Sequence, residues 1–186
     1  MIHLLFFLPL ISTHTQSCLN GLRESIGVLS VHNSLRYSIS QGRFIAKGKL
    51  MPRSLNPITN LTWDCSLEES AQKVADGCVF VHSGLPNVGE NLYKAWSSGK
   101  ISPSGLAVNA SQAWENEFQK YGWSDTTLTM NLFNSGVGHA TQMVWADTSK
   151  IGCGSSSCEN GNTVIVVCHY SKQGNVLGGK IYDAES

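Results

Sequence analysis

The chain has 186 residues, a length that suits a single domain with enough interior for a hydrophobic core. Its 13 Lys and Arg residues balance its 13 Asp and Glu residues, and the basic residues form no stripe or cluster. The charge pattern therefore indicates neither a nucleic-acid partner nor an anionic membrane surface.

Residues 1–16 contain no Lys, Arg, Asp or Glu, and Leu4 to Ile11 forms an apolar run too short to span a bilayer. Small polar residues follow this run. The pattern predicts a cleaved secretory signal peptide over residues 1–16, with a buried N-terminal helix as the alternative. We therefore expect a secreted, extracellular protein with one domain over residues 17–186 and no transmembrane segment.

All six cysteines follow the predicted signal peptide, and an even count in a secreted chain predicts three disulfides. Their spacing contains no Cys-x-x-Cys pair, so it does not indicate a zinc knuckle. Two Asn-x-Ser/Thr triplets, which begin at Asn60 and Asn109, are predicted N-glycosylation sites. The cysteines are Cys18, Cys65, Cys78, Cys153, Cys158 and Cys168.

Apolar residues at helical spacing predict a first helix over residues 21–41 that is buried on two sides. Glycines and prolines over residues 41–60 predict a long irregular connection. A second helix is expected to begin at Ser66, because Ser66 and Glu69 have the spacing of a capping box, and to end near Gly77.

A third helix is predicted over residues 110–121, where apolar side chains recur at spacings of three and four and Gly122 ends the pattern. Glu117 lies inside this apolar stripe. A carboxylate in that position must be neutral, paired or open to a cleft, because burying it alone is costly. Glu117 is therefore a candidate site residue.

Two strand-like segments follow, Lys150 to Gly154 and Thr163 to Tyr170, and Asn160 and Gly161 between them predict a hairpin. The second segment is largely apolar on both faces, which indicates a central strand that is covered on both sides. Helices on both faces of a small sheet predict an α+β fold. We expect a three-layer α-β-α sandwich with a small central antiparallel sheet.

Four titratable residues are expected at element ends, in turns or on an inward face: His82, Glu90, Glu117 and His139. Two imidazoles and two carboxylates that meet in one cleft can bind a divalent cation, since His nitrogen and carboxylate oxygen are both zinc ligands. The same side chains can also form a hydrogen-bonded set without a metal. The spacing alone leaves both interpretations open.

Gly138 to Trp145, with the sequence Gly-His-Ala-Thr-Gln-Met-Val-Trp, resembles the first signature of the CAP superfamily of cysteine-rich secretory, antigen 5 and pathogenesis-related proteins. The segment from Val167 to Tyr182 is similar to the second signature. Residues 61–65 and 78–83 further resemble the venom-allergen-like, or activation-associated, secreted proteins of nematodes. Four shorter segments also match, in the family's order: His32-Asn33-x-x-Arg36, His82-Ser83, Gly89-Glu90-Asn91 and Trp114-x-x-Glu117.

The resemblance implies the same α-β-α sandwich, with a central cleft lined by His82, Glu90, Glu117 and His139. In that cleft the two histidines can hold a weakly bound divalent cation such as zinc. The resemblance also implies that Cys158 pairs with Cys168. Two further bridges, in an arrangement that stays open, are then left to Cys18, Cys65, Cys78 and Cys153.

We expect a non-enzymatic monomer that binds an extracellular protein or lipid, as an effector or host-modulating protein of a nematode. No activated nucleophile is visible, because the adjacency of Ser83 and His82 in sequence does not provide serine-to-imidazole geometry. One alternative is a metal-assisted hydrolase in which Glu90 or Glu117 acts as the base. Another is a sterol or fatty-acid carrier whose groove is lined by Val176, Leu177 and Ile181, although core packing is the simpler explanation of these residues.

Overall fold

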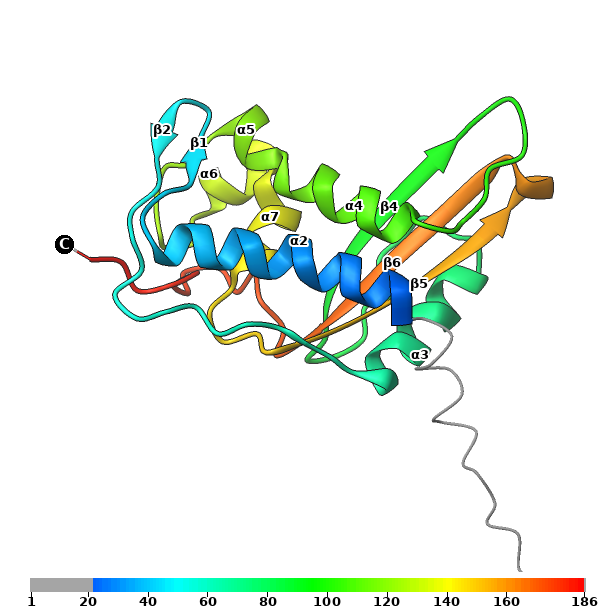
Figure 1. The fold of residues 1–186 in the computed structure, drawn as a ribbon, viewed down its shortest axis with the longest axis horizontal. Helices are drawn as coiled ribbons and strands as arrows, with labels where there is room; N and C mark the ends of the chain where they lie inside the picture. The colour runs from blue at the N-terminus through cyan, green and yellow to red at the C-terminus, as the bar shows by residue number, and fades with distance from the viewer. Residues whose placement is uncertain (1–21, 186) are drawn as a thin grey trace, which may run out of the picture.

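The computed structural model describes residues 22–185. It has three layers, with a four-stranded sheet between two layers of helices (Figure 1). Helices α2, α4 and α7 lie on one face of the sheet and α3 lies on the other, so the predicted α+β sandwich is confirmed. The predicted signal peptide, residues 1–16, lies outside the described residues. The helices are α2 Leu22–Ser40, α3 Cys65–Asp76, α4 Leu106–Glu115, α5 Glu117–Tyr121, α6 Met130–Leu132 and α7 Gly138–Val144.

The sheet has the strand order β3-β5-β6-β4. β5 and β6 form the predicted antiparallel hairpin, although β5 is longer than predicted, and β6 pairs antiparallel with β4 on its other side. The sheet departs from the antiparallel prediction at one edge, where the short β3 runs parallel to β5. Within the predicted irregular connection, β1 Ile45–Ala46 and β2 Lys49–Leu50 form a separate hairpin. The four strands are β3 Thr62–Trp63, β4 Gly89–Trp96, β5 Lys150–Cys158 and β6 Thr163–Ser171.

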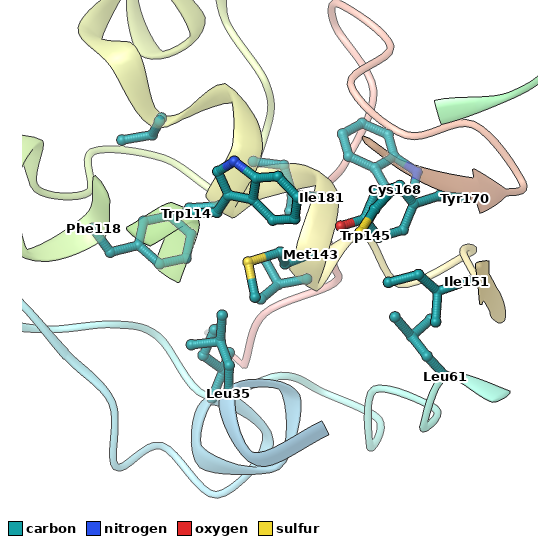
Figure 2. Close-up of a cluster of buried hydrophobic side chains, with 14 of the residues drawn as sticks. Leu35, Leu61, Trp114, Phe118, Met143, Trp145, Ile151, Cys168, Tyr170 and Ile181 are labelled. Carbon is teal, nitrogen blue, oxygen red and sulfur yellow. The ribbon is translucent and has the colours of Figure 1, made fainter. Parts of the chain in front are cut away.

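Alternate side chains of β6 enter two different cores, as the two-faced sequence of this strand predicts. Figure 2 shows the larger core, to which α2 contributes Leu35, α7 contributes Met143 and β6 contributes Tyr170. The β6 side chains in this core are Val164, Val166, Cys168 and Tyr170. The smaller core combines Ile165 and Val167 of β6 with Ala71 and Ala75 of α3.

Helix α2 confirms the predicted first helix but is buried on one side only. Ile26 and Tyr37, at 61% and 60% exposure, lie on its open side. Its buried polar residues include His32 and Arg36, which are fully buried. No helix within residues 22–185, α2 included, has the length and apolarity needed to cross a membrane.

The N-terminus of α3 is capped by a residue other than the predicted one. Asp64 accepts hydrogen bonds from the backbone N–H groups of Ser66 and Leu67 at 3.0 and 3.1 Å. The prediction that Ser66 begins the helix was therefore wrong, because a carboxylate two residues earlier satisfies these N–H groups. The predicted end of the helix is confirmed, with Gly77 at its C-terminus.

Helix α3 packs directly on the backbone of β5 at two glycines. A Cβ atom on Gly152 would lie 2.1 Å from the backbone nitrogen of Glu68. A Cβ atom on Gly154 would lie 2.4 Å from the Cα atom of Gln72. The missing side chains allow this close approach, which brings Ser70 of α3 to the sheet.

Two disulfides join described residues, and they correct the predicted pairing of Cys158 with Cys168. Cys168 is bonded to Cys153, and Cys158 is bonded to Cys78. The prediction was wrong because the β5–β6 register sets Cys153 opposite Cys168, with Cα atoms 4.1 Å apart, whereas Cys158 lies at the far end of β5. The other two cysteines are Cys65, which is also disulfide-bonded, and Cys18, which lies outside the described residues.

Candidate functional site

The structure places all four candidate site residues on the wall of one cavity of about 630 Å³. His82 lies in the segment after α3, and Glu90 is the second residue of β4. Glu117 begins α5, and His139 lies in the first turn of α7. Four elements that are far apart in the sequence therefore contribute one titratable side chain each.

Glu117 joins His139 to the start of α7. Its Oε2 accepts hydrogen bonds from the backbone N–H groups of His139 and Ala140, both at 3.0 Å. Its Oε1 lies 2.6 Å from Nδ1 of His139, and the ring of Trp114 stacks on this imidazole with 5.8 Å between ring centres. A carboxylate at a helix N-terminus also interacts favourably with the helix dipole. Glu117 thus has both a partner and an opening to a cavity.

Glu90 accepts hydrogen bonds from two histidines, one exposed and one buried. Its Oε1 lies 2.8 Å from both Nδ1 of His82 and the backbone nitrogen of Ser83. Its Oε2 lies 2.8 Å from Nε2 of His169, which is directly opposite Glu90 in the β4–β6 register. Burial alone would raise the pKa of Glu90, but the hydrogen bonds from His169, Ser83 and His82 outweigh burial and lower the pKa to about 2.

These hydrogen bonds determine which imidazole nitrogens carry a lone pair. A carboxylate only accepts hydrogen bonds, so His82 and His139 each donate through Nδ1. In a neutral imidazole the other nitrogen, Nε2, is then unprotonated. Within the described part of the chain, Nε2 of His82 and Nε2 of His139 form no hydrogen bond. The donor set therefore fits a cation, because carboxylate-bonded histidines are usual metal ligands.

Two polar residues behind Glu90 were not predicted from the sequence. His169 is fully buried, and its Nδ1 is hydrogen-bonded to the hydroxyl of Ser70 on α3. Neither residue lines the cavity. His169 lies within the predicted second strand, but strand β4 was not predicted, so the sequence did not pair His169 with Glu90. Ser70 has no sequence signal of its own.

A second chain of hydrogen bonds links helix α2 to the back of the site. Asn91 donates to the backbone oxygen of His139 and to the hydroxyl of Tyr170, both at 3.1 Å. The Tyr170 hydroxyl lies 2.9 Å from Nε2 of His32. Nδ1 of His32 lies 2.8 Å from the backbone oxygen of Val28. Hydrogen bonds through Asn91 and Tyr170 thereby link α7 to the buried His32 of α2.

The burial of His32 predicts a loss of stability in acid. Burial lowers the pKa of His32 from 6.5 to about 4, and the positive charge of Arg36 adds to this effect. The unfolded chain binds this proton at a higher pH than the folded chain does, so stability falls as the pH falls through this window. We expect a loss on the order of 3 kcal/mol between the two pKa values.

Urea unfolding at a series of pH values measures this loss. A His32→Gln variant is less stable at neutral pH but should show a flatter pH dependence than the wild type. Equal slopes for the two proteins over the same pH range would show that His32 is not the group responsible.

The residues expected to line a lipid groove do not share one surface. Val176 and Leu177 are 53% and 50% exposed, whereas Ile181 is fully buried in the larger core. A groove lined by all three residues is therefore wrong, and the simpler interpretation, core packing, is confirmed for Ile181.

Comparison with known proteins agrees with the fold. The family model described as "Cysteine-rich secretory protein family", CAP, matches residues 29–170. "Ancylostoma secreted protein" of Ancylostoma caninum is 36% identical over 172 residues, which cover 87% of this chain and 40% of that protein. "Venom allergen 5" of Microctonus hyperodae is 32% identical over 163 residues, which cover 83% of this chain and 69% of that protein. The chain thus spans about two fifths of the Ancylostoma protein.

Solved structures show the same relationship. BmVAL-1 superimposes with a TM-score of 0.82 at 35% identity, over 88% of this chain and 84% of that chain. The crystal structure of NaASP2 with Zn2+ superimposes with a TM-score of 0.80 at 36% identity, over 87% of this chain and 86% of that chain. Sequence and structure thus agree that this chain, which resembles nematode venom-allergen-like and Ancylostoma secreted proteins, belongs to the CAP family of cysteine-rich secretory proteins.

Proposed function

We propose that this protein acts outside the cell by binding, and that His82 and His139 hold a divalent cation such as zinc in the cavity. One observation carries the proposal. Each imidazole bonds a glutamate through Nδ1, which leaves Nε2 on each ring for a ligand. The crystal structure of the related NaASP2 with Zn2+ supports the choice of metal.

The donor set predicts weak binding. Within residues 22–185, no three His, Cys, Asp or Glu side chains are grouped as ligands, so water or a partner must complete the coordination shell of a cation held by two histidines. A bound cation would supply a positive charge that attracts carboxylate or carbonyl oxygens of a partner. Glu90 and Glu117 would orient the two imidazoles rather than coordinate the cation.

The hydrogen bonding of both carboxylates argues against a metal-assisted hydrolase. Glu90 and Glu117 each already accept three hydrogen bonds, at least one of them from an imidazole, so each carboxylate orients a histidine rather than a water molecule. Ser70, His169 and Glu90 are residue types of a hydrolytic triad, but Ser70 and His169 do not line the cavity.

Turnover assays distinguish binding from hydrolysis. We expect the purified, zinc-loaded protein to leave peptide and ester substrates intact. Steady turnover by the wild type that disappears in Glu90→Gln and Glu117→Gln variants would overturn the proposal, because only a reaction at this site would depend on both carboxylates.

We further propose that the chain is secreted, that its partner is an extracellular protein or lipid, and that it acts as a nematode effector. Its similarity to a secreted protein of Ancylostoma caninum and its disulfides support an extracellular setting. Asn60 and Asn109 are both exposed, so glycans fit at either residue. Expression in eukaryotic cells should give secreted protein that begins after residue 16. Mass spectrometry should detect glycans that are lost in the Asn60→Gln and Asn109→Gln variants.

A further inference from the structure

We propose that His169 and Ser70 form a buried relay that positions Glu90 and, through Glu90, the imidazole of His82. The inference rests on the cation site proposed above and extends that site to two residues outside the cavity. Its basis is an unbroken chain of hydrogen bonds. The Ser70 hydroxyl is bonded to Nδ1 of His169, and Nε2 of His169 lies 2.8 Å from Glu90, which lies 2.8 Å from His82.

The chemistry of each group fixes the direction of each hydrogen bond. The carboxylate of Glu90 accepts, so His169 donates to it through Nε2. Nδ1 of a neutral His169 then carries the lone pair, and the hydroxyl of Ser70 donates to it. His82 meets the same carboxylate through Nδ1. One tautomer of each histidine satisfies the whole chain, and in that tautomer Nε2 of His82 is free to bind a cation.

The burial of these side chains shows which end of the chain is held firmly. The His169 side chain is 0% exposed and the Glu90 side chain 7%, whereas the His82 side chain is 63% exposed. Within the described part of the chain, Glu90 is the sole hydrogen-bond partner of the His82 side chain. An exposed ligand of this kind depends on its buried partner for its orientation.

Two features of the fold hold the buried end of the relay. The strand register sets His169 between Glu90 of β4 and Gly152 of β5. Because Gly152 has no side chain, α3 approaches the sheet closely enough for Ser70 to reach His169. The arrangement assigns Ser70 and His169 a positioning role, since neither lines the cavity.

Two substitutions of similar size separate positioning from simple core packing. In His169→Gln, the amide nitrogen lies near the former Nε2 and keeps a donor toward Glu90. In His169→Asn, the shorter side chain places its amide near Nδ1 and loses that donor. Each variant is measured in two ways. ¹⁵N NMR of the metal-free protein at about pH 8, above the ordinary imidazole pKa, gives the tautomer of His82, and calorimetry gives the zinc affinity.

The proposal predicts that His169→Gln keeps His82 protonated at Nδ1, with zinc affinity within about threefold of the wild type. It predicts that His169→Asn mixes the His82 tautomers and weakens zinc binding about tenfold, as loss of a supporting hydrogen bond commonly does. Ser70→Ala, which removes only a hydroxyl, should mix the His82 tautomers in the same direction but to a smaller extent. This variant replaces His169→Asn in the test if His169→Asn fails to fold.

Unchanged His82 tautomers in folded His169→Asn and Ser70→Ala would overturn the relay. If the tautomers change as expected but the wild type binds no zinc, the relay stands as the support of Glu90 and His82, and the cation site alone fails. The NMR measurement contains no metal, so the two failures cannot be confused.

Discussion

Replacing Arg36 by Ala is expected to lower the free energy of unfolding by about 4 kcal/mol or more. The fully buried guanidinium donates to four backbone oxygens at 2.7 to 3.1 Å, and burial lowers its pKa to about 10. No Asp or Glu among the described residues forms an ion pair with it, so the backbone alone stabilises the charge. Its partners are the carbonyl groups of Thr59, Met143, Trp145 and Thr148.

Arg36→Met provides the matched control for side-chain volume. It retains much of the apolar stem but leaves the same carbonyl groups without a donor, so it should be destabilised nearly as strongly as Arg36→Ala. Arg43→Ala, at an exposed arginine, should change stability little. Denaturant unfolding measures the stability of all three variants. If Arg36→Met unfolds at the same denaturant concentration as the wild type, these hydrogen bonds do not hold α2, the loop before β3 and the end of α7 together.

Replacing Glu117 by Ala is expected to weaken zinc binding by about 10- to 100-fold and to lower stability by about 2 kcal/mol. The substitution removes the acceptor of His139 Nδ1 and of two backbone N–H groups at the start of α7. His139 is then free to rotate and to change tautomer. Calorimetric titration with zinc and denaturant unfolding measure the two effects.

Glu115→Gln is the control for charge, because Glu115 lies two residues before Glu117 and its side chain forms no hydrogen bond within the described part of the chain. Burial raises the pKa of Glu115, so its neutral replacement should not reduce stability. Zinc affinity should remain that of the wild type. Equal weakening by both substitutions would show that net charge, and not the orientation of His139, governs binding.

The parts of the fold that could be predicted are those where one periodicity dominates. The residues of β6 are largely apolar on both faces because both faces are buried. This pattern is visible in the sequence, and it predicted the central strand and the layers on either side. β4 was not predicted, since Gly, Asn and Lys are unfavourable in strands and only its pairing with β6 makes it one. The cysteine pairing required strand register, which no local pattern contains.

In the candidate site, too, the residues that could be predicted are those marked by a local sequence pattern. Glu117 was found because a carboxylate in an apolar stripe needs a partner, and His139 because of the motif around it. Arg36 appeared only within a motif and carried no prediction, although three of its four hydrogen bonds join segments more than 100 residues apart. His169 and Ser70 depend on cross-strand pairing and on the close approach of α3 to Gly152, which are properties of the folded chain.

Zinc titration of the wild type against a His82→Ala, His139→Ala double variant tests the central claim most directly. Each imidazole has Nε2 available in the same cavity, so we expect the wild type to bind about one zinc ion per chain with modest affinity and the double variant to bind none at that site. Equal binding by the two proteins, or no binding by the wild type, would contradict the account.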